Sequence, residues 1–197
     1  MSPDDLRERY ERIRAEVGKS VTIVVATKYV DVDDMQALAD AGVEVVGENR
    51  AQELETKHAR YADLFRWHFI GHLQSRKAKA VNDLCELCHS LASESAAKRL
   101  TIPALVEVNL SGEPSKSGIA PDELPRFLGL YADVRGLMTM PPAADDPEAS
   151  RPYFRRLREL AEQHGLRELS MGTSQDYRVA AEEGATYVRV GSILYGK

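Results

Sequence analysis

Short apolar runs alternate with longer amphipathic stretches along the whole chain. The first run, Val21–Thr27, is uncharged and largely β-branched, and similar runs recur roughly every 20 to 30 residues. Because uncharged runs of this kind are typical of strands buried on both faces, they predict a parallel sheet. The eight predicted strands cover residues 21–27, 43–46, 67–70, 87–91, 104–109, 134–140, 168–170 and 187–190.

Each predicted strand except the last is followed by a stretch with helical periodicity, and one more helix precedes the first strand. Asp4 or Asp5 is the expected cap of that first helix, whose apolar residues are Leu6, Tyr10, Ile13 and Val17. Eight strands alternating with helices favour an α/β fold, a closed (β/α)₈ TIM barrel with an extra N-terminal helix, over an open doubly wound sheet. No linker or change of composition divides the sequence, so we expect a single domain over residues 1–197.

Composition and charge exclude several functional classes. The 197 residues are 29 % charged and carry a net charge of −5, with acidic and basic residues interspersed. A nucleic-acid or anionic-membrane binder would show a basic face, so we expect neither partner. No apolar segment is long enough to span a bilayer, and the acidic N-terminus is unlike a secretory signal, which predicts a cytoplasmic protein. No histidine or carboxylate spacing suggests a metal site.

Lys28 is the first candidate for chemistry, because it directly follows the apolar run Val21–Thr27. At the end of a barrel strand, apolar surroundings would disfavour the ammonium, lower its pKa and make the amine a nucleophile toward aldehydes. The alternative is a lysine that ends a strand and extends its amine into water.

Two glycine- and serine-containing segments follow the last two predicted strands. They are Ser170–Ser174 and Gly191–Ser192. In barrels of this class the loops after strands seven and eight commonly form a phosphate site from backbone N–H groups and hydroxyls. Together with Lys28, these loops suggest a ligand that is both an aldehyde and a phosphate ester, and pyridoxal 5′-phosphate fits that description.

Cys85 and Cys88 match the C-x-x-C redox spacing and, with His89, the C-x-x-C-H pattern of haem attachment. If both cysteines lie on one strand, residues three apart point to opposite faces and are too distant for a disulfide. We therefore expect cysteines packed in the core, with a redox or metal role as the alternative.

Several longer motifs occur in one order from the first predicted strand to the C-terminus. They are Ala26–Lys28, Gly47–Glu53, Trp67–Ser75, Val108–Gly118, Gly136–Thr139, Leu169–Tyr177 and Val188–Ser192. With these motifs the sequence resembles the pyridoxal phosphate homeostasis protein family, whose barrel is similar to the N-terminal domain of alanine racemase.

The resemblance implies that Lys28 holds pyridoxal phosphate as an internal aldimine. It also implies that Ser174, Gly191 and Ser192 bind the phosphate. Thr173, in the same loop, departs from the methionine more frequent in the family, which would alter packing without removing these donors.

The resemblance further implies that Arg189 faces the pyridine nitrogen, that Asn49 lies beside the ring and that Met138 lines the pocket. Lys116 is a candidate second contact for cofactor or partner, or a solvated loop lysine. His68 and His72 flank the third strand, and either of them lines the pocket or packs beneath it.

The motifs and the resemblance leave two functions open. The first is a monomeric protein without catalytic residues that buffers or delivers pyridoxal phosphate, with pyridoxal-phosphate-dependent apoenzymes as candidate recipients. The second is an amino-acid racemase of the alanine racemase type. We favour the first, because Arg189 cannot protonate the ring nitrogen as a carboxylic acid can, and because the sequence offers no second base beside Lys28. We also expect no further domain of the kind that supplies a catalytic tyrosine in alanine racemases.

Overall fold

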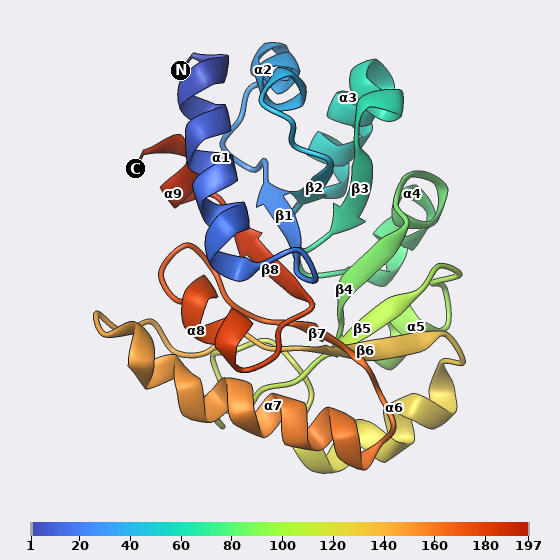
Figure 1. The fold of residues 1–197 in the computed structure, drawn as a ribbon. Coiled ribbons are helices and arrows are strands. Elements are labelled where there is room, and N and C mark those ends of the chain that lie inside the picture. Colours follow the sequence, from blue (N-terminus) through green and yellow to red (C-terminus); the bar gives the residue numbers. More distant parts are fainter. Residues whose placement is uncertain (1, 197) are drawn as a thin grey trace.

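The computed structural model describes residues 2–196, which form a closed barrel of parallel strands surrounded by helices (Figure 1). The strands are β1 (Thr22–Ala26), β2 (Val45–Glu48), β3 (Arg66–Phe69), β4 (Leu87–Leu91), β5 (Ala104–Glu107), β6 (Val134–Met138), β7 (Glu168–Ser170) and β8 (Tyr187–Val190). The α-helices are α1 (Pro3–Val17), α2 (Met35–Asp40), α3 (Ala51–Tyr61), α4 (Ala78–Leu84), α5 (Glu94–Ala97), α6 (Leu124–Leu130), α7 (Arg151–Gln163), α8 (Tyr177–Glu182) and α9 (Ser192–Tyr195). Short 3₁₀ segments are η1 (Val32–Asp34), η2 (Ala62–Leu64), η3 (Ser75–Lys77), η4 (Pro121–Glu123) and η5 (Pro147–Ser150).

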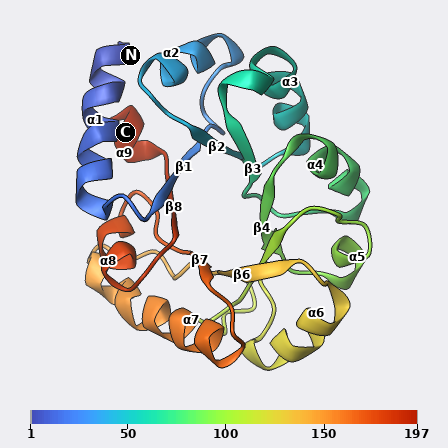
Figure 2. The same cartoon turned by 45° about the vertical axis from the view of Figure 1, so that its right-hand side comes forward.

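The strands pair in sequence order, and β1 pairs with β8 to close the ring. Figure 2 shows the ring of strands with the helices arranged around it. The closing register places Thr22 opposite Tyr187 and Val25 opposite Val190. The predicted α/β barrel is therefore confirmed. Parallel closure brings the C-terminal ends of all eight strands to one face of the barrel, where loops far apart in sequence meet.

Strands β1, β5 and β6 end earlier than the apolar pattern predicts, at Ala26, Glu107 and Met138. Strand β2 differs in the other direction, because it begins at Val45 and continues through Glu48, two residues beyond the predicted end at residue 46. Glu48 is completely buried. A charged residue continues this strand because a buried partner, described below, compensates its carboxylate.

Helix α1 occupies the outer position beside β1 and β8, next to the four-residue α9 (Figure 1). The helix that follows β8, α9, has only four residues, and α1, whose apolar stripe is buried in the main core, covers this side of the barrel together with it. The expected cap was wrong: Ser2 accepts a hydrogen bond from the backbone N–H of Asp5, while Asp4 and Asp5 lie in the first turn.

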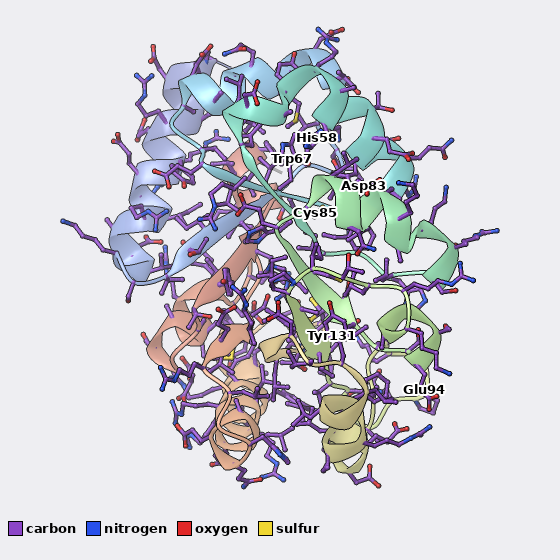
Figure 3. All side chains as sticks on the ribbon, turned by 90° about the vertical axis from the view of Figure 1, so that its right-hand side faces the viewer. His58, Trp67, Asp83, Cys85, Glu94 and Tyr131 are labelled. Atoms are coloured by element: carbon purple, nitrogen blue, oxygen red, sulfur yellow. The ribbon has the colours of Figure 1, made fainter. Side chains whose placement is uncertain are left out.

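The main core lies between the barrel and the helices. Figure 3 shows His58 on α3 close to Trp67 on β3, with ring centroids 5.5 Å apart. Cys85 directly follows the last residue of α4, whereas Cys88 is on β4, so the two cysteines do not share a strand. Both thiols are free and buried, which confirms their packing in the core, and burial raises the pKa of the Cys88 thiol to about 11.

The inside of the barrel holds a small apolar cluster of Leu87, Leu105 and Met138, against which Tyr187 packs. Buried polar side chains fill other interior positions, among them His68 and His89. Within residues 2–196, no helix has the length and hydrophobicity needed to cross a membrane.

Candidate functional site

A cavity of about 360 Å³ opens at the C-terminal ends of β1, β2 and β8. Six of the seven predicted site residues line it: Lys28, Asn49, Ser174, Arg189, Gly191 and Ser192. The other lining residues are Ala26, Tyr29, Ile70, Met140, Thr173 and Gln175. The fold thus gathers an amine, a guanidinium, two serine hydroxyls and an amide around one space.

Lys28 lies in the turn after β1, two residues beyond the last strand residue, Ala26. Its side chain is exposed, so the burial that we expected is wrong; the strand ends too early to carry this residue into apolar surroundings. The amine Nζ lies 4.7 Å from the centroid of the Tyr29 ring, a cation–π contact. No carboxylate of the described residues pairs with it, so the amine is accessible from the cavity.

A buried ion pair lies beneath the turn that carries Lys28. Lys57 Nζ donates to Glu48 Oε1 at 2.5 Å and to the backbone oxygen of Thr27 at 2.7 Å, and the Thr27 hydroxyl donates to the same carboxylate at 2.6 Å. The other carboxylate oxygen accepts from the backbone N–H of Asn49 at 3.1 Å. The pair therefore fixes the backbone immediately before Lys28 and at Asn49.

We did not predict this pair from the sequence. The signal for it is Lys57 itself, which falls on the apolar side of α3 together with Ala51, Leu54 and Tyr61. A lysine on the buried stripe of a helix requires a partner, since an unpaired buried ammonium is costly.

The side-chain oxygen of Asn49, Oδ1, is buried and has no hydrogen-bond partner among the described residues. Gly71 packs directly against the Asn49 backbone, where an added Cβ would lie 2.0 Å from the carbonyl oxygen. Only glycine permits this approach. Because this amide oxygen lies at the edge of a cavity and lacks a donor, it is suited to a ligand that donates a hydrogen bond to it.

The loops after β7 and β8 are joined through Ser174. Its Oγ accepts from the backbone N–H of Gly191 at 3.0 Å and of Ile193 at 3.3 Å. Asp176 holds the first loop in place, because its carboxylate accepts from the Thr173 backbone N–H at 2.7 Å and from the Ser150 hydroxyl at 2.7 Å. Ser192 contributes a second, exposed hydroxyl to the same corner of the cavity.

Arg189 is buried, with 6 % of its surface exposed. Its Nη1 donates to Ser170 Oγ at 2.5 Å, and its Nη2 donates to the backbone oxygen of Thr139 at 3.1 Å and to the sulfur of Met140 at 2.9 Å. Burial lowers the pKa of the guanidinium to about 10, although Glu107 opposes that shift. The side chain therefore remains a fixed cation at neutral pH.

Met138 does not line this cavity, whereas Met140, which we did not predict, does. Met138 is the last residue of β6 and is 2 % exposed, whereas Met140 follows the strand and is 47 % exposed, so Met140 lies closer to the mouth of the barrel. Met138 borders a neighbouring cavity of about 270 Å³ that Asn49, Met140 and Arg189 also line.

That neighbouring cavity also contains His72, Glu107 and Lys116. Glu107 is 6 % exposed, and burial raises the pKa of its carboxyl group, although Arg189 and His72 oppose the shift. Of the two histidines near β3, His72 thus lies at the cavity and His68 packs beneath it. Within the described part of the chain, no group of three or more metal-ligating side chains is gathered.

Comparisons with known proteins agree with this geometry. The family described as "Alanine racemase, N-terminal domain" matches residues 1–197. A pyridoxal phosphate homeostasis protein of Aquifex aeolicus is 37 % identical over 96 % of this chain and 94 % of its own length. Another from Deinococcus radiodurans is 38 % identical over 92 % of this chain and 93 % of its own. The chain belongs to the pyridoxal phosphate homeostasis protein family.

A solved member of this family has the same barrel. The structure of PipY from Synechococcus elongatus with pyridoxal phosphate bound superposes with a TM-score of 0.86 at 32 % identity, covering 97 % of this chain and all of that one. An alanine racemase from Clostridium difficile superposes with a TM-score of 0.78 at 16 % identity. It covers 98 % of this chain but 56 % of that one, so it shows a shared barrel fold.

Proposed function

We propose that this member of the pyridoxal phosphate homeostasis family binds pyridoxal phosphate and buffers or delivers it without transforming amino acids. The observation that carries this proposal is the placement of Lys28, Ser174, Ser192 and Arg189 around one cavity. The cofactor combines a phosphate, a pyridine ring and an aldehyde that condenses with primary amines. The donor set of the cavity fits each of these groups.

Each polar group of the cavity then has a role. Lys28 offers the accessible primary amine for covalent attachment. Ser174, Gly191 and Ser192 supply hydroxyl and backbone N–H donors for the phosphate, in the two loops where barrels of this class commonly bind it. The phosphate would compete with Ser174 Oγ for the N–H groups of Gly191 and Ile193, which the two loops already bring together.

Arg189, Asn49 and the two methionines would surround the ring. Arg189 presents a permanent cation to the ring nitrogen and disfavours its protonation, which limits how strongly the ring withdraws electrons. Asn49 offers its unpartnered Oδ1 beside the ring. Met140 contributes to the rim, and Met138 supports the interior below it.

An amino-acid racemase is the second candidate, because alanine racemase shares the barrel fold. Racemisation requires a base on each face of the substrate. The residues that line the main cavity include one amine and no carboxylate or histidine; Tyr29 supplies a phenol, but 71 % of its surface is exposed. This lining supports a carrier rather than a racemase. In the same proposal, the chain acts as a monomeric single domain, and apoenzymes that use the cofactor are its recipients.

Borohydride reduction of the protein loaded with pyridoxal phosphate, followed by peptide mapping, tests the proposal. We expect the pyridoxyl group on the peptide that contains Lys28, and no label in Lys28→Ala. Lys116→Ala is the matched control and should be labelled like the wild type. Label on Lys116, or none, would overturn the proposal. Before reduction, the loaded protein should leave L-alanine, L-serine and L-glutamate unracemised, whereas turnover of about 1 s⁻¹ or more would favour the enzyme.

A further inference from the structure

A line of buried hydrogen bonds crosses the barrel interior and ends at Arg189. His68 Nδ1 lies 2.9 Å from His89 Nε2, His89 Nδ1 lies 2.7 Å from Ser170 Oγ, and Arg189 Nη1 lies 2.5 Å from the same oxygen. These four residues, which we call the interior network, come from β3, β4, β7 and β8, and none is more than 6 % exposed. None of the roles proposed above uses His68, His89 or Ser170.

The cation at one end of the interior network determines where each proton lies. A guanidinium only donates, so Ser170 Oγ accepts from Arg189. Within residues 2–196, the only other hydrogen-bond partner of that hydroxyl is His89 Nδ1. A buried hydroxyl proton without an acceptor is costly, so the serine donates and His89 Nδ1 accepts.

The same reasoning extends to the second histidine. A neutral His89 that accepts at Nδ1 carries its proton on Nε2 and donates it to His68 Nδ1. His68 then also carries its proton on Nε2, which is buried without a partner among the described residues. The opposite polarity would leave two groups unsatisfied, the Ser170 hydroxyl proton and the His68 Nε2 lone pair, so it is disfavoured.

The surroundings keep both histidines neutral. The Tyr187 ring packs against both, at 5.9 Å from the His68 ring and 5.1 Å from the His89 ring. Burial, followed by the charge of Arg66 on β3, lowers the pKa of His68 to about 3. Burial, followed by the neighbouring His68 and then by the cation of Arg189 on β8, lowers the pKa of His89 well below its usual value.

We propose that His89 is a positioning residue that, through the Ser170 hydroxyl, fixes Arg189 against the cofactor ring, with both histidines as neutral Nε2–H tautomers. Thr139 and Met140 hold only Nη2 of the guanidinium, so Ser170 is the acceptor that fixes Nη1. Without His89, the serine hydroxyl loses the acceptor that orients it. The contact between Arg189 and the ring rests on the function proposed above, whereas the tautomers do not.

The tautomers can be tested without cofactor. Nitrogen-15 NMR of the imidazole rings in the cofactor-free protein, assigned with His89→Asn and His68→Gln, should show both histidines as neutral Nε2–H forms that do not titrate near neutral pH. An Nδ1–H tautomer or an imidazolium at His89 would overturn the assigned polarity.

The positioning role needs variants and a spectroscopic measurement. His89→Leu removes the acceptor for Ser170, whereas His89→Asn keeps a side-chain oxygen near the position of Nδ1. Cys88→Ala is the control, since Cys88 is buried one residue earlier on β4 and packs in the outer core. We measure the Kd of pyridoxal phosphate and the pH dependence of the absorption band of the bound cofactor, with thermal unfolding to establish that each variant is folded.

We expect His89→Leu to raise the Kd about fivefold, the effect of one hydrogen bond, and to shift the pH midpoint of the absorption band. His89→Asn should restore most of both properties, and Cys88→Ala should change neither. Equal effects of His89→Leu and Cys88→Ala would overturn the positioning role. If His89→Leu does not fold, His89→Asn and Ser170→Ala are compared instead. An absorption midpoint shifted equally far in these two variants would overturn the positioning role. Failure of the wild type to bind pyridoxal phosphate would contradict the proposed function, while the NMR result would still decide the tautomers.

Discussion

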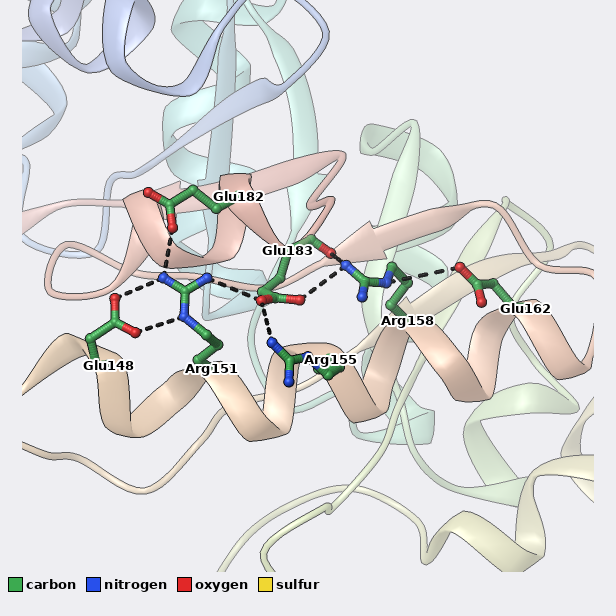
Figure 4. Close-up of polar contacts among 7 residues, drawn as sticks. All are labelled: Glu148, Arg151, Arg155, Arg158, Glu162, Glu182 and Glu183. Carbon is green, nitrogen blue, oxygen red and sulfur yellow. Dashed lines mark hydrogen bonds and ion pairs between the residues drawn. The ribbon is translucent and has the colours of Figure 1, made fainter.

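Opposite charges meet in two contrasting regions of this protein, beneath the cofactor cavity and on the surface between α7 and α8. In the first region, the side chains of Glu48 and Lys57 are each 1 % exposed, and they form a single pair at 2.5 Å. In the second, Glu183 lies among three arginines, with N–O distances of 3.0 Å to Arg151, 3.3 Å to Arg155 and 3.0 Å to Arg158 (Figure 4).

The surface group is redundant. Arg151 also binds Glu148 and Glu182, each at 2.6 Å, and 26 % of its side chain remains exposed. Burial would raise the pKa of Glu183, but hydrogen bonds from the arginines outweigh it and lower that pKa. Glu183 itself is only 5 % exposed, but three arginines that reach water share its charge, so the loss of one contact leaves the others in place.

The buried pair has no such substitutes. Within the described residues, the hydrogen bonds of Lys57 Nζ go to Glu48 and to the Thr27 backbone, and the carboxylate orients Thr27 and Asn49 as well. The two regions therefore differ in what they hold: the surface group joins two helices, whereas the buried pair fixes the backbone from which Lys28 and Asn49 extend. This contrast predicts effects of different size and kind.

Breaking the buried pair should have the largest effect. Lys57→Met leaves the Glu48 carboxylate buried without its cation, so we expect the free energy of unfolding in urea to fall by about 3–5 kcal/mol. The same variant should bind pyridoxal phosphate more weakly, because the Thr27 and Asn49 backbone loses its support.

The double variant Glu48→Gln/Lys57→Met is the control for this experiment, because it removes both charges. It should recover a large part of the stability that the single variant loses. A double variant as unstable as Lys57→Met would contradict the account, because it would show that packing rather than the unpaired charge causes the loss.

Acid separates the buried polar groups from the surface group. The pKa of His68 is lowered to about 3, and that of His89 is also lowered. Below pH 6.5, the ordinary pKa of histidine, both side chains therefore bind protons in the unfolded chain but not in the folded protein. The free energy of unfolding should therefore fall as the pH decreases below about 6.5, by up to about 1.4 kcal/mol per pH unit for each histidine. Glu183 has a lowered pKa as well, but its contribution is lost only below about pH 4.5.

Urea unfolding at a series of pH values between about 7 and 5 measures this slope. The matched comparison is His89→Asn, in which the slope should decrease by the share of one histidine. The contribution of Glu107, whose raised pKa acts in the opposite direction, cancels between the two proteins. Identical slopes would show that His89 is protonated in the folded protein.

The sequence predicted the barrel and the placement of most candidate residues because both follow from alternation. Apolar strands separated by helices close in order, and parallel closure brings the ends of β1, β2, β7 and β8 together whatever their exact length. Lys28, Asn49, Ser174 and Arg189 therefore meet, even though several strand ends were misplaced.

What the sequence did not predict depends on those strand ends and on contacts between a helix and the strand beside it. Lys28 is exposed because β1 stops at Ala26. Met140 rather than Met138 reaches the main cavity, because β6 ends at Met138 and Met140 lies beyond it. The pairing of Glu48 with Lys57 was not predicted, because a charge pattern shows which residue needs a partner but not which residue of the neighbouring strand supplies it.

The smallest effect should come from the surface group. Glu183→Gln removes the carboxylate that three arginines share. Each of those arginines remains in contact with water, and Arg151 also keeps its ion pairs with Glu148 and Glu182. We expect the free energy of unfolding to fall by about 1 kcal/mol, less than in Lys57→Met, because glutamine can still accept a hydrogen bond and because the three arginines are at least 26 % exposed and reach water. The Kd of pyridoxal phosphate should stay unchanged, because Ser150 and Thr173 hold Asp176 at the start of α8, while Glu183 caps the other end of that helix. Glu162→Gln, which removes one 3.9 Å contact with Arg158, is the comparison at an exposed glutamate, since 69 % of the Glu162 side chain is exposed. If Glu183→Gln weakened the cofactor as much as Lys57→Met does, the α7–α8 surface would take part in holding the phosphate loop, and the contrast between the two regions would fail.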